Sequence, residues 1–274
     1  GKPDVLMQVY NVIGKTQGQF PMPFGSNIYL YLDLYLEDEA NVKKAIDEAK
    51  YLNQKLKNSS MIVRITRPTN VQIMEFIKNE LKHFSTIYLQ IDYANKGFSK
   101  IIREDYRKYN IGMIMLTQDM FKNKNEIKTV LELKIPIFKF GKEKLKSVKR
   151  TVIVLNDTNS YEQISPIVFD VSSQLKLKTK VFDLDPIGEK DGKSDLLSHF
   201  ESLAKIFNEK LEIVSNGENP IRELKKQRNM LQILPLKEDM FKKRFLFKYF
   251  YTNSDFIAFD MNKFNQLLIP ISEE

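Results

Sequence analysis

Cysteine is absent from this 274-residue chain, and histidine occurs only twice. The absence of cysteine excludes disulfide bonds, thiolate zinc sites and cysteine nucleophiles, and it agrees with a reducing cytoplasm, the location that we expect. The two histidines, His83 and His199, lie in or next to separate predicted helical segments, far apart in the sequence. Ordinary surface or boundary positions explain them better than a shared metal or catalytic pair, so no metal site is predicted.

Long apolar runs and glycine-rich motifs are also missing. No run approaches the roughly 18 residues that span a bilayer, and the N-terminus lacks the apolar core of a signal peptide, so we expect a soluble chain without direct membrane insertion. The ten glycines are too scattered to form a Walker loop or a G-x-G-x-x-G turn, and no G-x-S-x-G elbow is present. These absences favour a protein that is not an enzyme.

The composition is that of a globular protein with a basic excess. Apolar residues make up 42% and charged residues 28%, and 43 Lys and Arg against 35 Asp and Glu leave a formal charge of +8. The excess favours anionic partners, but it is spread over the whole chain, so nucleic acid ranks last among the partners considered. A length of 274 residues fits two domains that each bury a core.

Two apolar runs end in the same four residues, Asp-Met-Phe-Lys, which begin at Asp119 and Asp239. The two aspartates are 239 − 119 = 120 positions apart, which indicates two copies of one unit. Each run is typical of a strand that is buried on both faces of a parallel sheet. Ligands of open α/β sheets bind beyond the carboxyl ends of such strands, so the residues that follow the runs decide much of the function.

Strands alternate with amphipathic helices in both units. The first unit has predicted strands at 27–36, 61–66, 86–92, 111–118 and 136–140, with helices at 41–56, 71–81, 98–109 and 126–133. The second has predicted strands at 151–155, 179–184, 211–215, 230–236 and 267–271, with helices at 161–175, around 196–207 and from Pro220. Pro270 in the last strand suggests an edge position, because proline cannot donate to a ladder. The pattern predicts an α/β fold with two tandem, doubly wound, mainly parallel five-stranded sheets.

Both units end the second predicted strand near a proline, Pro68 or Pro186, and the second unit continues its third strand into the stretch Val214 to Pro220. With the strand order, these features resemble a universal stress protein domain, and residues 26–274 resemble a tandem pair. The resemblance implies UspA-like, HUP-like three-layer α/β/α domains at 26–145 and 146–274. Such domains commonly pair through their last strands, so the expected contact joins the regions of Ile137 and Leu268.

The opening residues, Gly1 to Leu6 followed by a short helix, resemble the end of the C-terminal lobe of an RCK domain, the cytoplasmic regulator of TrkA-like potassium transport. The junction from Gln19 to Ser26 is similar to that of bacterial proteins in which an RCK protein continues into a stress-protein-like tail. The resemblance implies that residues 1–25 end an RCK lobe and that the chain is the tail of a longer polypeptide. The implied partners are the RCK nucleotide-binding half of that polypeptide and a membrane potassium transporter.

The glycine-rich phosphate loop of nucleotide-binding stress proteins has no counterpart here. The residues after each predicted fourth strand hold no glycine and include Asp119 and Asp239, whose carboxylates would repel phosphate, so neither bound triphosphate nor a cofactor is expected. Asp33 near the end of the first strand, and Asn156 with Asp157 just past its counterpart, remain candidates for a nucleotide crevice, because the family places an acidic residue there against adenine or ribose. Capping of the following turn or helix explains these side chains at least as well.

A basic connector joins the two units, with lysines at 142, 144, 146 and 149 followed by Arg150. A solvated link is the favoured interpretation, and anion binding is the alternative. Together these observations favour a non-catalytic regulatory or sensory module of a TrkA-like potassium-transport protein. The alternative is a module that binds a small molecule, such as an adenine nucleotide or a cyclic dinucleotide, without hydrolysing it. The sequence leaves open whether the chain forms a homo-oligomer.

Overall fold

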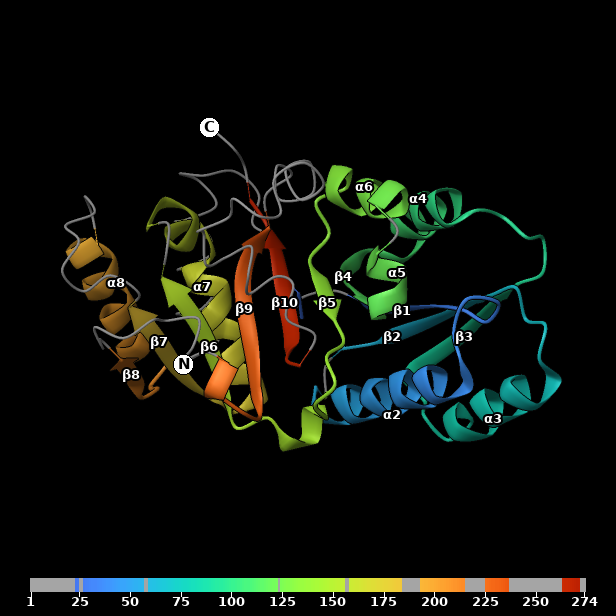
Figure 1. Ribbon diagram of the computed structural model, residues 1–274, viewed down its shortest axis with the longest axis horizontal. Helices are drawn as coiled ribbons and strands as arrows, with labels where there is room; N and C mark the ends of the chain where they lie inside the picture. Colours follow the sequence, from blue (N-terminus) through green and yellow to red (C-terminus); the bar gives the residue numbers. More distant parts are fainter. Residues whose placement is uncertain are drawn as a thin grey trace.

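The computed structural model describes residues 23–24, 27–56, 59–122, 124–155, 158–183, 193–214, 225–236 and 263–271. These residues form a ten-stranded sheet with helices packed against it (Figure 1). The strand order is β3-β2-β1-β4-β5-β10-β9-β6-β7-β8. No helix in the described ranges combines the length and the apolar character that a membrane crossing requires.

The sheet consists of two halves with one topology. The first half contains β1 (Asn27–Asp33), β2 (Met61–Thr66), β3 (Ile87–Asp92), β4 (Ile111–Leu116) and β5 (Ile137–Lys139). The second contains β6 (Arg150–Leu155), β7 (Lys178–Asp183), β8 (Leu211–Val214), β9 (Met230–Leu236) and β10 (Asn265–Pro270). Read from each outer edge inward, β3-β2-β1-β4-β5 is repeated by β8-β7-β6-β9-β10. The predicted duplication of a five-stranded, mainly parallel unit is confirmed, whereas the domain boundaries at 26–145 and 146–274 stay predictions.

The two halves meet through their last strands. β5 and β10 are antiparallel, with Ile137 opposite Leu268 and Lys139 opposite Gln266, so the predicted contact is confirmed. The other described strand pairs are parallel. The expectation of two separate sheets was wrong, because this ladder joins them into one continuous sheet. Pairing satisfies the N–H and C=O groups that two edge strands would otherwise leave open.

Pro270 lies in a central strand, which corrects the edge position predicted for it: β10 has β5 on one side and β9 on the other. The backbone N–H of Ile271 donates to Leu236 of β9, so the nitrogen of Pro270 points to the opposite side, since amide directions alternate along a strand. The ladder to β5 has already ended at Leu268 on that side. The missing N–H of the proline therefore breaks no ladder bond.

Helices cover the two faces of the first half-sheet (Figure 1). One face carries α2 (Glu39–Lys55) and α3 (Val71–Leu81), and the other carries α4 (Phe98–Tyr109), α5 (Gln118–Lys122) and α6 (Lys124–Glu132). The helices α7 (Thr158–Leu175) and α8 (Lys193–Ile206) share the hydrophobic core of α2 and α3. A single apolar core thus runs along one face of both halves.

Local capping explains why several helices begin and end where the sequence predicts. The side chain of Asn70 accepts hydrogen bonds from the backbone of Gln72 and Ile73 and so starts α3. Asn110 adopts a left-handed conformation (φ 50°) and ends α4. The predicted strand at 111–118 is too long, because the chain turns after Leu116 into the short helix α5, which the sequence analysis missed.

Gly141, two residues beyond β5, lies directly against the backbone of the second half. A Cβ built on it would lie 2.2 Å from the carbonyl carbon of Phe264 and 2.6 Å from the nitrogen of Asn265. The N–H of Gly141 donates to the Oδ1 of Asn265 at 2.8 Å, which holds the two backbones in this position. Any side chain at residue 141 would push the ends of β5 and β10 apart.

We expect Gly141→Ala to lower the free energy of unfolding by roughly 2 kcal/mol or more, because the methyl group meets rigid backbone. Gly97 is the matched control, since a Cβ there would have no atom within 4 Å. Gly97→Ala should change stability by less than about 1 kcal/mol. Urea denaturation of both variants measures the difference, and two equally small effects would contradict the close approach.

Candidate functional site

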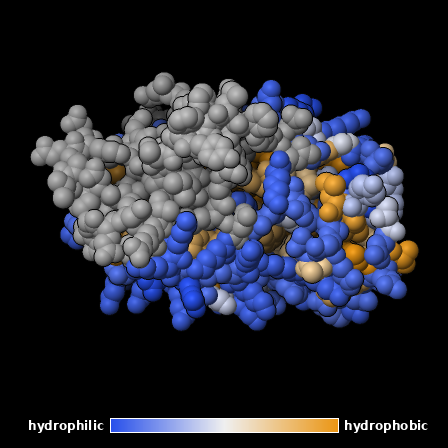
Figure 2. Space-filling model, in the orientation of Figure 1, coloured by the Kyte–Doolittle hydropathy of each residue, from blue (hydrophilic) through white to orange (hydrophobic). Residues whose placement is uncertain are grey.

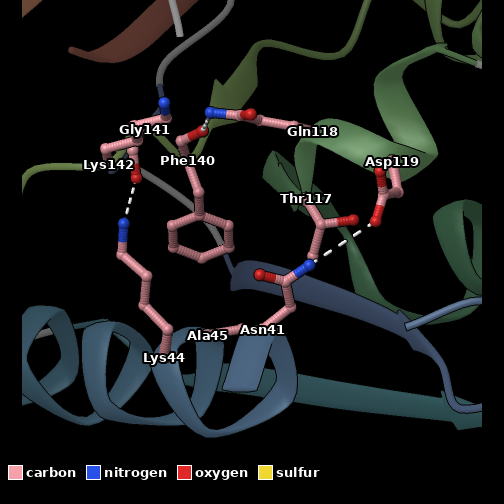
Figure 3. A pocket seen from close by; sticks show the side chains of 9 residues that line it. All are labelled: Asn41, Lys44, Ala45, Thr117, Gln118, Asp119, Phe140, Gly141 and Lys142. Atoms are coloured by element: carbon pink, nitrogen blue, oxygen red, sulfur yellow. Dashed lines mark hydrogen bonds between the residues drawn. The ribbon is translucent and has the colours of Figure 1, made fainter. Parts of the chain in front are cut away.

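An open cavity lies at the carboxyl ends of β4 and β5, next to the first turns of α2 (Figure 3). Its volume is about 310 Å³. We call it the β4 cavity; its lining residues are Asn41, Lys44, Ala45, Thr117, Gln118, Asp119, Phe140, Gly141 and Lys142. The sequence analysis expected ligands to bind beyond the carboxyl end of the apolar run that precedes Asp119, and the cavity lies there.

The topology of the first half-sheet opens this cavity. After β1 the chain enters α2 on one face, and after the neighbouring β4 it enters α5 and α6 on the other. Neighbouring strands whose connections leave to opposite faces create a crevice between them, which is where α/β proteins bind ligands. The carboxylate of Asp38 starts α2 by accepting a hydrogen bond from the N–H of Asn41 at 2.7 Å, which fixes the first turn at the cavity edge.

Polar groups from three elements surround the cavity. Figure 3 shows the Lys44 ammonium of α2 reaching the carbonyl oxygen of Gly141, to which it donates a hydrogen bond. The amide of Asn41 donates to Asp119 at 3.5 Å, and the amide of Gln118 donates to the carbonyl of Phe140 at 3.1 Å. Burial lowers the pKa of Lys44.

The Phe140 ring forms an apolar wall of the cavity among these polar groups. Phe121, the side chain that could have filled the crevice, is buried in the core on the opposite face instead. Its ring lies 4.9 Å below the ammonium of Lys139. The cavity therefore stays open, with an aromatic wall and both donors and acceptors along its rim.

The residues after β4 make no phosphate cradle. Thr117 precedes the five-residue helix α5, and its hydroxyl accepts a hydrogen bond from the N–H of Met120 at 3.3 Å. Asp119 lines the cavity with a carboxylate that is about half exposed (46%). A negative charge stands where a phosphate group would need converging N–H donors. The predicted loss of the phosphate loop thus agrees with the geometry of this segment.

A buried carboxylate lies beside the cavity and was not recognised in the sequence. The hydroxyl of Thr117 donates to Oε1 of Glu37, while Oε2 of Glu37 has no hydrogen-bond partner within the described residues. Burial raises the pKa of the Glu37 carboxyl, the Thr117 hydroxyl opposes the rise, and the charge of Asp119 adds to it. No sequence signal distinguishes Glu37 from the exposed acids around it, because its burial arises from the approach of β4.

Asp33, the first predicted site residue, does not line the β4 cavity. Its carboxylate is buried and forms an ion pair with Arg67, whose Nε lies 2.9 Å from Oδ1. The N–H of Tyr35 also donates to Oδ1 at 3.0 Å, and the Arg67 guanidinium lies 4.4 Å from the centre of the Tyr35 ring. These contacts correspond to the turn-stabilising interpretation of Asp33 rather than to a free acceptor for a nucleobase.

The other predicted site residues, Asn156 and Asp157, lie outside the described residues. The same holds for residues 237–262, which follow β9 in the sequence. Within the described part of the chain, no group of three or more His, Asp or Glu side chains is placed to hold a metal ion. The lining of the β4 cavity thus includes none of the three predicted residues.

Comparison with proteins of known structure identifies the fold of this chain. No protein-family model matches the chain, and neither does any curated protein. A putative universal stress protein from Pseudomonas aeruginosa UCBPP-PA14 superposes with a TM-score of 0.57 at 12% identity, over 90% of this chain and 94% of that chain. A universal stress protein from Archaeoglobus fulgidus DSM 4304 also gives 0.57 at 12% identity, over 91% and 98%. The chain therefore has a universal stress protein fold along nearly its whole length, as the sequence resemblance implies.

We expect Asp33→Asn to destabilise the protein by about 1–3 kcal/mol, because it leaves Arg67 without its buried counter-charge. Asp119→Asn is the control, since this carboxylate is exposed and should change stability by less than about 0.5 kcal/mol. Thermal and urea denaturation measure both variants. An Asp33→Asn protein as stable as the parent would show that the ion pair contributes nothing and would return Asp33 to the candidate ligand contacts.

Proposed function

We propose that this chain is a non-catalytic regulatory or sensory module that binds a small polar effector in the β4 cavity. The observation that carries the proposal is an open crevice at the carboxyl end of a parallel sheet, with an aromatic wall and a mixed polar rim. Pockets of this kind, largely preformed and with a few convergent polar groups, are the usual binding sites of α/β proteins. The hydroxyl at the rim, Thr117, is engaged with Glu37 and with the first turn of α5, which supports a structural role over that of a nucleophile.

The lining favours a nucleoside-sized ligand of low charge. The amides of Asn41 and Gln118 can offer donors and acceptors to a planar heterocycle, and the largely buried Phe140 supplies part of the apolar lining. Two lysines, Lys44 and Lys142, line the cavity against the single carboxylate of Asp119, which leaves an excess of one positive charge. These features support an adenine nucleoside, a nucleoside monophosphate or part of a cyclic dinucleotide and disfavour a triphosphate.

Ligand binding at this place can act on both halves of the sheet. Lys44 of α2 donates to the carbonyl of Gly141, and the N–H of Gly141 donates to Asn265 in the second half. A ligand that competes for Lys44 or presses on Gly141 changes the contact between the halves. A ligand shifts a conformational equilibrium by its difference in affinity for the two states, which is the mechanism that a regulatory module needs.

Isothermal titration calorimetry with AMP, ATP and cyclic di-AMP tests the proposal. We expect saturable heat with AMP or cyclic di-AMP, weaker binding of ATP, and no turnover of any of them. Gln118→Ala should weaken binding about tenfold, since one amide contact of a buried ligand is lost. Gln72→Ala is the matched control, because Gln72 is an exposed glutamine in the first turn of α3, away from the cavity. Hydrolysis of a nucleotide, or the absence of heat with all three, would contradict the proposal.

The finer part of the proposal is that the module belongs to a TrkA-like potassium-transport protein. Its support is the resemblance of residues 1–25 to the end of an RCK lobe and to the junction that follows. Sequencing the gene upstream of the codon for Gly1 tests it directly. We expect a continuous reading frame that encodes an RCK nucleotide-binding half. An upstream frame without such a domain would contradict the potassium-transport assignment and leave the effector proposal untouched.

A further inference from the structure

A second cavity of about 530 Å³ lies between α2 and the connector that joins the two halves. The connector contributes the short 3-10 helix η1 (Leu145–Ser147). We call this cavity the connector groove; its lining residues are Lys44, Asp47, Glu48, Lys50, Tyr51, Gln54, Lys144 and Lys146. In Figure 2 the surface along the lower central edge, where α2 and the connector lie in Figure 1, is mostly hydrophilic.

Contacts between η1 and α2 build the walls of the groove. The buried Glu48 of α2 accepts a hydrogen bond from the N–H of Leu145 at 2.7 Å, and the Leu145 side chain is itself buried in the core. Tyr51 is half-buried and packs against the same core from the α2 side. Because both walls are held by buried contacts, a ligand finds the groove already formed and loses little free energy in ordering it.

The charges of the groove favour an anion. Four lysines line it, against the two acids Asp47 and Glu48. One of the lysines, Lys50, forms an ion pair with Glu80. Lys144 and Lys146 are exposed, and no carboxylate of the described residues forms an ion pair with either.

Lys44 lies deeper in the groove and remains half-buried. Burial lowers its pKa, Glu48 opposes this, and the nearby ammonium of Lys144 lowers it further. The ammonium groups of Lys44 and Lys144 therefore repel each other, and the carboxylates of Glu48 and Glu143 offset part of this repulsion. An anion placed between the two ammonium groups would remove that repulsion and be attracted to both.

We propose that the connector groove binds a small anion that carries two or more phosphate groups. The cations that line the groove are lysines, whose ammonium groups bind phosphate oxygens as point charges. A volume of about 530 Å³ is that of a site for a compact ligand rather than for a nucleic acid strand. The basic connector is thus a binding element, which the sequence analysis kept only as the alternative to a solvated link.

Occupancy of the groove would also reach the β4 cavity, because Lys44 lines both. A phosphate that draws the Lys44 ammonium toward Lys144 weakens its hydrogen bond to Gly141. This coupling rests on the proposed function, whereas the existence of the anion site does not. If the two sites are coupled, each ligand changes the affinity of the other by the same factor.

Calorimetry of the full chain with pyrophosphate and tripolyphosphate, at low and at physiological salt, tests the anion site. We expect saturable binding that is tighter for tripolyphosphate and weakens as salt is added. The double variant Lys144→Gln/Lys146→Gln should lose affinity by about tenfold or more, because both are exposed lysines of the groove rim. Because both side chains are exposed, we expect the double variant to fold normally, and circular dichroism checks this.

A matched control distinguishes binding in the groove from the general attraction of anions to a basic protein. Lys149→Gln/Lys205→Gln removes the same charge from exposed positions that do not line the groove, and it should change affinity by less than about twofold. Gln118→Ala should leave tripolyphosphate binding unchanged, so failure of the effector proposal and failure of this one are distinguishable. Absence of saturable heat, equal losses in both double variants, or tighter binding of a single-stranded DNA oligonucleotide than of tripolyphosphate at the same lysines would each overturn the proposal.

Discussion

The antiparallel ladder between β5 and β10 is the contact on which the rest of the structure depends. β5 is only three residues long, yet it pairs with β4 on one side and with β10 on the other. Without this ladder each half-sheet would expose an edge strand whose side chains are now buried, including Ile137 and Leu268. Pairing the two edges removes both from water and makes the duplicated units one sheet.

The contact between β5 and β10 also fixes the geometry of the β4 cavity. Gly141 follows β5 and is held by Asn265 of β10, whose amide also donates to the carbonyl of Glu143 at 3.0 Å. The side chain of Glu143 in turn accepts a hydrogen bond from the N–H of Asn229 at 2.8 Å. One wall of a cavity in the first half is therefore positioned by residues of the second half. The proposed effector site and the connector groove both lie against this junction, which connects ligand binding to the relation between the halves.

Much of the fold was predictable, because it is encoded in local patterns. The strands at 61–66 and 230–236 and the helices at 71–81 and 98–109 have the predicted bounds, since apolar periodicity and capping residues mark their ends. The repeated Asp-Met-Phe-Lys revealed the duplication, and the resemblance to stress proteins placed the junction at the last strands. The edge position predicted for Pro270 was wrong. A proline is excluded from a central strand only where its nitrogen would face a hydrogen-bonded neighbour, and the sequence does not reveal that register.

The candidate site was less predictable, because its residues come together only in the folded chain. Lys44 lies on the polar side of an amphipathic helix, where a lysine is ordinarily solvated, and only the approach of Gly141 gives it a partner. Asp33 ends β1, where the family places a nucleotide contact, but Arg67, 34 residues later, forms an ion pair with its carboxylate. The sequence analysis thus found the position of the crevice from the topology, but the residues that it proposed are not those that line the cavity.

Native-state hydrogen exchange across the junction is the most direct measurement of whether the two halves form one unit. The backbone amides of β5 and β10 should exchange only through global unfolding, with the same opening free energy as those of the central strands β1 and β9. Rapid exchange at the β5–β10 ladder, while β1 and β9 stay protected, would show that the halves separate in the native state and that the junction holds neither site in place.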